Sequence, residues 1–146
     1  MELAAKSGVQ HATEDVDRNL WHQPAYQAYR ILHAGFTVAP ILAGADKFLN
    51  LLAHWEQYVA ALIPRVTGIS AHTFMLIVGV IEVVAGIGVA LKPRIFAYVV
   101  SAWLLGIVLN LVLLPGYFDI ALRDFGLSLG ALALARLSAT YEGRKA

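Results

Sequence analysis

The sequence predicts an all-α integral membrane protein, a bundle of four transmembrane helices with both termini in the cytoplasm. Two observations predict this class. Apolar residues make up 59% of the 146 residues and charged residues only 14%, whereas soluble domains are about 45–50% apolar and about 25% charged. The apolar residues also gather into four stretches of roughly 20, which is the length of helix that crosses a hydrocarbon core of about 30 Å.

The composition excludes several function classes. The net charge of +1 lacks the basic surplus of a nucleic-acid-binding protein and the high charge of a disordered chain. The chain contains no cysteine, so disulfides, thiolate metal sites and cysteine nucleophiles are absent. No catalytic motif is recognisable, and whether the protein is an enzyme stays open.

Turn residues separate the four predicted spans. Pro64 and Gly68 lie in the first loop, Pro93 in the second and Pro115-Gly116 in the third. The spans cover approximately residues 29–51, 73–91, 95–114 and 120–138. We expect an interfacial segment at about 51–63, where apolar and polar residues mix at helical spacing, and polar tails at 1–28 and 139–146.

Lysine and arginine are unevenly divided between the two sides of the membrane. The tails and the second loop carry more of them than the first and third loops. By the positive-inside rule the two tails and the second loop face the cytoplasm.

Each predicted span carries a stripe of small residues that includes or runs into polar ones. The stripes are Gly35, Ala39 and Ala43 before Asp46 and Lys47; Gly79, Glu82 and Gly86; Ala102, Gly106 and Asn110; and Arg123, Gly126, Gly130 and Ala133. Residues three or four apart share a helix face, and small residues let membrane helices pack closely. We therefore expect the polar side chains to point into the bundle.

The polar residues of the spans are expected to form one intramembrane cluster, which opens toward the outer side. Its members are Asp46, Lys47, Glu82, Asn110, Arg123 and Asp124. Glu82 falls near the midplane, where an unpaired charge is unfavourable by about 2.5–3.5 kcal/mol. We expect Arg123 to be its first partner and Lys47 the second, because a guanidinium holds a carboxylate with two bonds. Either the cluster only locks the helices in register, or it is a working site that moves a proton or binds a polar headgroup.

The five histidines raise the question of a haem or metal. Only His33 lies inside a predicted span, and we expect it to pack against serine or backbone partners. His54, Glu56 and His72 share the outer side, but their spacing fits no metal-binding pattern. We therefore predict no metal site.

A set of residues resembles the DoxX-like family of small membrane proteins. The set is Arg30, Gly35, Gly44 and Lys47 in the first span, Glu82, Gly86 and Gly88 in the second, and the basic residues around Pro93. The resemblance covers roughly residues 30–138 and implies a four-helix bundle in the prokaryotic cytoplasmic membrane. Members are associated with membrane complexes that handle oxidative and thiol stress, and the family takes its name from a subunit of a thiosulfate:quinone oxidoreductase. The long N-terminal tail and the segment 136–140 depart from the family pattern.

We accordingly expect an accessory subunit of a redox or quinone-linked membrane system. Glu82 would carry a proton, Arg123 and Lys47 would balance its charge, and Asn110 would act as a hydrogen-bond donor. No cofactor is evident from the sequence, and a quinone is the one that this cluster would suit. The expected partners are the lipid bilayer and a membrane redox complex or a second copy of the chain, and no nucleic acid. Two alternatives stay open: a non-catalytic scaffold or assembly protein, and a small proton-coupled carrier, which would have to dimerise.

Overall fold

The computed structural model describes residues 20–142, and this part of the chain is all-helical, with no strand. Its four long helices are α2 (Pro24–Leu49), α4 (Ala71–Leu91), α5 (Pro93–Val112) and α6 (Phe118–Tyr141). Between α2 and α4 lie a 3-10 helix, η1 (Trp55–Tyr58), and the short α3 (Leu62–Thr67). The all-α prediction is confirmed, while most of the predicted tail at 1–28 and part of that at 139–146 lie outside the described residues.

The helix ends follow from local sequence. Pro24 and Pro93 occupy first-turn positions of α2 and α5, where a missing N–H and a fixed φ favour helix initiation. The hydroxyl of Ser70 caps α4 by accepting a hydrogen bond from the backbone N–H of Thr73 at 3.2 Å. Asn50 ends α2 and Gly68 ends α3 in the left-handed conformation, with φ of 51° and 71°, a common C-terminal signal.

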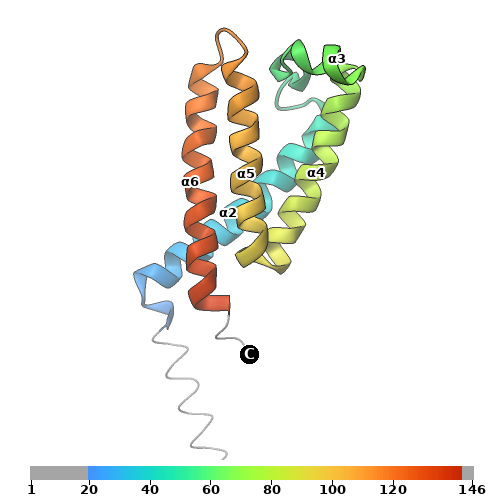
Figure 1. The fold of residues 1–146 in the computed structure, drawn as a ribbon. Coiled ribbons are helices and arrows are strands. Elements are labelled where there is room, and N and C mark those ends of the chain that lie inside the picture. Colours follow the sequence, from blue (N-terminus) through green and yellow to red (C-terminus); the bar gives the residue numbers. More distant parts are fainter. Residues whose placement is uncertain (1–19, 143–146) are drawn as a thin grey trace, which may run out of the picture.

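The long helices form two closely packed pairs, α2 with α4 and α5 with α6. The chain runs up α2, down α4, up α5 and down α6, so the start of α2 and the end of α6 lie at the same end of the molecule (Figure 1). Helix α2 crosses the others obliquely and also contacts α6. The short helices η1 and α3 sit at the opposite end, which is also the end of the turn between α5 and α6 (Figure 1).

The α2–α4 pair is held at short range by two glycines. A β-carbon added to Gly44 would lie 2.5 Å from the backbone oxygen of Gly79, and one added to Gly79 would lie 2.7 Å from that of Gly44. Any side chain at either position would therefore push the helices apart. This close approach sets the distance between the polar residues that the two helices carry.

The predicted small-residue stripes are correct on α4 and wrong on much of the other helices. Gly79 and Gly86 of α4 face α2. By contrast, Gly35, Gly106 and Gly126 have open space where a side chain would lie. On α6 the buried line is Ala121, Asp124, Ser128, Ala131, Ala135 and Ser138. The reason is helix rotation, because the stripes leave open which of two adjacent faces meets the neighbouring helices.

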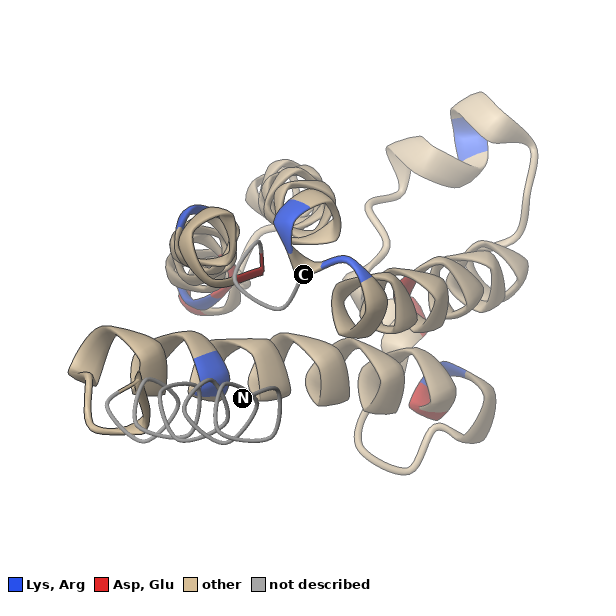
Figure 2. Ribbon diagram, turned by 90° about the horizontal axis from the view of Figure 1, so that it is seen from below, with Lys and Arg blue, Asp and Glu red and all other residues tan. Residues whose placement is uncertain are grey.

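Apolar side chains cover the outside of all four long helices. Exposed examples are Val38 and Leu42 on α2, Val84 on α4, Leu109 on α5 and Leu122 on α6. Charged residues occupy few positions along the ribbon (Figure 2). Of the described helices, α4 and α5 are long and apolar enough to cross a membrane, with mean hydropathies of 2.5 and 2.2.

Candidate functional site

The centre of the polar cluster is an ion pair between α2 and α4. The ammonium group of Lys47 donates a hydrogen bond to a carboxylate oxygen of Glu82 at 2.5 Å. The two side chains are 3% and 11% exposed. Gly44 lies one helical turn before Lys47 and Gly79 three residues before Glu82, so the glycine contact brings exactly this stretch of the two helices together.

The indole of Trp55 covers the Lys47 ammonium from the side of the loop. The nitrogen lies 3.8 Å from the centre of the ring, a cation–π contact that is strongest where water is excluded. Lys47 is thus held by a carboxylate on one side and an aromatic face on the other.

Asp46, the neighbour of Lys47, binds the loop that follows α2. Its carboxylate accepts hydrogen bonds from the backbone N–H groups of Leu51 and Leu52 and from the indole N–H of Trp55, at 2.9, 3.1 and 2.7 Å. A carboxylate at a helix C-terminus is electrostatically unfavourable by itself. These donors compensate for that, and they fix the ring that covers Lys47.

Helices α5 and α6 contribute Trp103 and Asp124 to the surroundings of Glu82. The indole of Trp103 approaches the Glu82 carboxylate as a hydrogen-bond donor, and the buried Asp124 lies within electrostatic reach of it. The indole N–H of Trp103 is buried and has no hydrogen-bond partner within residues 20–142. Buried donors in native structures are normally paired, and the Glu82 carboxylate is an acceptor within reach of this N–H.

Asn110 is committed to the loop that follows α2. Its amide nitrogen donates to the carbonyl of Tyr58 at 2.6 Å, and its amide oxygen accepts from the N–H of Ala60 at 3.0 Å. This pair of bonds ties the loop to the end of α5. Asn110 was expected to donate a hydrogen bond inside the polar cluster. Its amide group instead binds the loop.

The expectation that Arg123 is the first partner of Glu82 is wrong. The side chain of Arg123 is 64% exposed and pairs with its neighbour Asp124 at 2.9 Å. Helix α6 is turned so that Asp124 faces the bundle and Arg123 faces outward. Lys47 takes the position opposite Glu82 because the two glycines bring α2 against α4.

The histidines take separate positions. A ring nitrogen of His33 lies 2.9 Å from the carbonyl oxygen of Val89, which confirms the expected backbone partner. His72 pairs with Glu56 at 2.7 Å on the exposed surface. Over residues 20–142 no group of three or more His, Cys, Asp or Glu side chains is arranged to hold a metal ion.

Two members of the site, Trp55 and Trp103, were not among the sequence candidates. Trp103 lies seven residues before Asn110 and therefore on the same helix face. This spacing could have identified Trp103 from the sequence. Trp55 reaches the cluster only through the path of the loop, and no periodicity reports such a path.

Comparison with known proteins finds no matching family model, curated protein or solved structure. The fold and the site themselves define the class of protein: a helical bundle with an apolar exterior and an internal ion pair.

Proposed function

We propose that this chain is a four-span membrane protein of the DoxX-like kind, with both termini in the cytoplasm of a prokaryotic cell, that serves as an accessory subunit of a redox or quinone-linked membrane system. The observation that carries the membrane location is the distribution of polarity. Lys47, Glu82 and Asp124 are buried, whereas valines and leucines cover the outside. Water disfavours large exposed apolar surfaces, and lipid favours charged side chains that face one another inside a bundle.

The length of the less apolar helices supports four spans. Helices α2 and α6 contain 26 and 24 residues, which at about 1.5 Å per residue gives about 39 and 36 Å. Both lengths exceed a hydrocarbon core of about 30 Å. Of their charged side chains, Asp46, Lys47 and Asp124 are buried. The exposed Arg30, Arg123 and Arg136 lie within two turns of a helix end, where long basic side chains can reach the membrane surface.

Cysteine labelling tests the topology, because the chain has no cysteine of its own. Gln57→Cys and Lys92→Cys introduce thiols at exposed positions in the loops at opposite ends. We expect an impermeant maleimide to label the first in intact cells and the second only after the membrane is opened. Labelling of both from one side, or recovery of the chain in the soluble fraction, would refute four spans with this orientation.

The support for a redox or quinone link is the buried donor beside the ion pair. A quinone carbonyl needs a hydrogen-bond donor in an apolar setting, and the buried N–H of Trp103 is such a donor. The carboxylate of Glu82 lies beside it as a group that could exchange a proton. Binding of a quinone by Trp103 and Glu82 would need neither a metal ion nor a nucleophilic side chain.

Mass spectrometry of co-purified small molecules tests the quinone site. We expect about one quinone per chain in native membrane discs of the wild type, and loss of it in Trp103→Phe, which keeps the ring and removes the N–H. Trp21→Phe is the control, because Trp21 is exposed and lies just before the start of α2. Equal quinone content in all three proteins, or only bulk lipid in each, would refute the site.

A second candidate is a scaffold or assembly protein without a small-molecule site. It is favoured by the ion pair of Lys47 and Glu82, in which each side chain neutralises the other. This ion pair connects α2 and α4 where the two helices approach closely. If Glu82→Gln lowers the amount of folded protein while quinone is absent from the wild type, this role replaces the first. Cross-linking in intact membranes would then identify the protein partners.

A further inference from the structure

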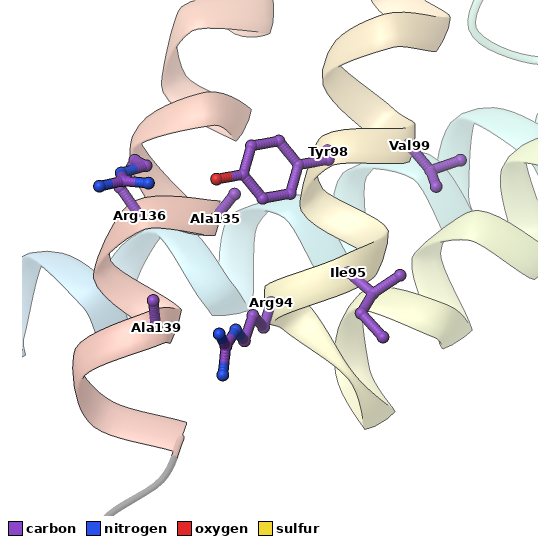
Figure 3. A pocket seen from close by; sticks show the side chains of 7 residues that line it. All are labelled: Arg94, Ile95, Tyr98, Val99, Ala135, Arg136 and Ala139. Atoms are coloured by element: carbon purple, nitrogen blue, oxygen red, sulfur yellow. The ribbon is translucent and has the colours of Figure 1, made fainter.

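A groove lies between the start of α5 and the end of α6, and it is lined by neither member of the ion pair. Its volume is about 440 Å³. The lining residues are Arg94, Ile95, Tyr98, Val99, Ala135, Arg136 and Ala139. The two arginines come from different helices and point in different directions, Arg136 toward the side of α6 away from α5 and Arg94 downward from the start of α5, while the hydroxyl of Tyr98 points toward Arg136 (Figure 3). The cluster around Glu82 has no part in this groove.

The groove combines three features that match one type of molecule. Its polar rim has two guanidinium groups and a phenol, which together bind phosphate oxygens well because guanidinium donors fit them in pairs. Its walls are apolar, and the two alanines of α6 leave room for a chain. Ile95, one of its lining residues, is 58% exposed, so apolar surface continues from the groove.

We propose that this groove binds an anionic phospholipid, with the phosphate held by Arg94 and Arg136 and an acyl chain lying against Ile95 and Val99. The inference rests on the membrane location proposed above. Basic pockets between helices at the cytoplasmic side are suited to anionic headgroups, and the positive-inside rule puts this end of α5 and α6 there. Tyrosine, as at Tyr98, is favoured at the membrane interface.

Within the described part of the chain, neighbouring acidic side chains do not pair with the two arginines, Arg94 and Arg136. A carboxylate oxygen of Glu142 accepts a hydrogen bond from the backbone N–H of Arg94 at 3.3 Å, so this acid contacts the main chain at the edge of the groove. A zwitterionic lipid brings a cation that the two arginines disfavour, and selectivity for a net anionic lipid follows.

Native mass spectrometry of the full-length protein in nonionic detergent tests the proposal. Phosphatidylglycerol and phosphatidylcholine with the same acyl chains are added in steps. We expect the wild type to retain one phosphatidylglycerol at concentrations where phosphatidylcholine is not retained. Combined Arg94→Gln and Arg136→Gln should lower this retention about tenfold or more, given the contribution of each basic side chain near a charged membrane surface.

The matched control combines Arg30→Gln with Arg65→Gln, which removes the same charge outside the groove. This control should retain the lipid as the wild type does. If the glutamine variant fails to fold, Arg94→Lys with Arg136→Lys replaces it. Its lipid retention should fall below that of the wild type, because the paired donors are lost while the charge stays.

Three results would overturn the proposal. They are equal retention of the two lipids, equal retention by the groove variant and the control, and displacement of the lipid by soluble glycerol phosphate, which would mean that the acyl chain adds nothing. Failure of the membrane proposal looks different, since the wild type would then remain in solution without detergent.

Discussion

The Lys47 ammonium lies 2.5 Å from the Glu82 carboxylate, across a sequence separation of 35 residues, and both groups are buried. An ion pair in such a place is unfavourable to break, because the group left behind keeps its charge without a partner. The pair also lies where the glycine backbones of α2 and α4 touch. Charge and close packing therefore act on the same contact, and the predictions below separate them.

Lys47→Met and Glu82→Gln should each destabilise the fold, by about 3–5 kcal/mol if the remaining charge stays buried. The combination of Lys47→Met with Glu82→Leu should recover most of this loss, since neither charge remains. Thermal unfolding in detergent, followed by circular dichroism, measures the difference. If the double variant is as unstable as the worse single variant, the ion pair is not the relevant interaction.

Gly44→Ala should separate α2 from α4, because its β-carbon would lie 2.5 Å from the backbone oxygen of Gly79. Overpacking of this kind costs about 1–3 kcal/mol. Gly106→Ala is the matched control, since nothing lies within 4 Å of the added atom, and it should be neutral or stabilising by up to about 1 kcal/mol. The same unfolding measurement compares the two. Equal effects would contradict the close contact of the helices.

Asp46→Ala should release the loop after α2, because three donors lose their acceptor. Each donor left unsatisfied costs about 1–3 kcal/mol where it stays buried. Hydrogen exchange at the amides of Leu51 and Leu52 should become faster by a factor of ten or more. Glu56→Ala removes a carboxylate from the same loop, where it pairs with the exposed His72, and should leave exchange at these amides unchanged. Unchanged exchange in Asp46→Ala would show that the carboxylate does not order the loop.

Asn110→Ala should detach the second part of this loop from α5. Two hydrogen bonds, to Tyr58 and Ala60, are lost together, and limited proteolysis should then cut the segment 50–61 faster. Leu109→Ala changes an exposed neighbour on the same helix and should not alter the cleavage rate. Should both variants be cut alike, general loosening of α5 would explain the result better than loss of the amide bonds.

The helices and their ends could be predicted from the sequence. Apolar runs, the prolines at the start of α2 and α5, and Gly68 act through local backbone geometry. The polar residues of the candidate site were also recognisable, since charges are rare in such stretches. Four membrane spans remain a prediction, although the helices occupy the predicted ranges.

The pairing of those polar residues was decided only by the tertiary structure. Adjacent residues on a helix differ in direction by about 100°, so Arg123 and Asp124 cannot both face the bundle, and the sequence pattern does not say which one does. The structure turns Asp124 inward and Arg123 outward. The partner of Glu82 follows from a contact between Gly44 and Gly79, which lie far apart in the sequence. The sequence by itself determined that charges would be buried in an apolar bundle, and the rotation and spacing of the helices decided which charges meet.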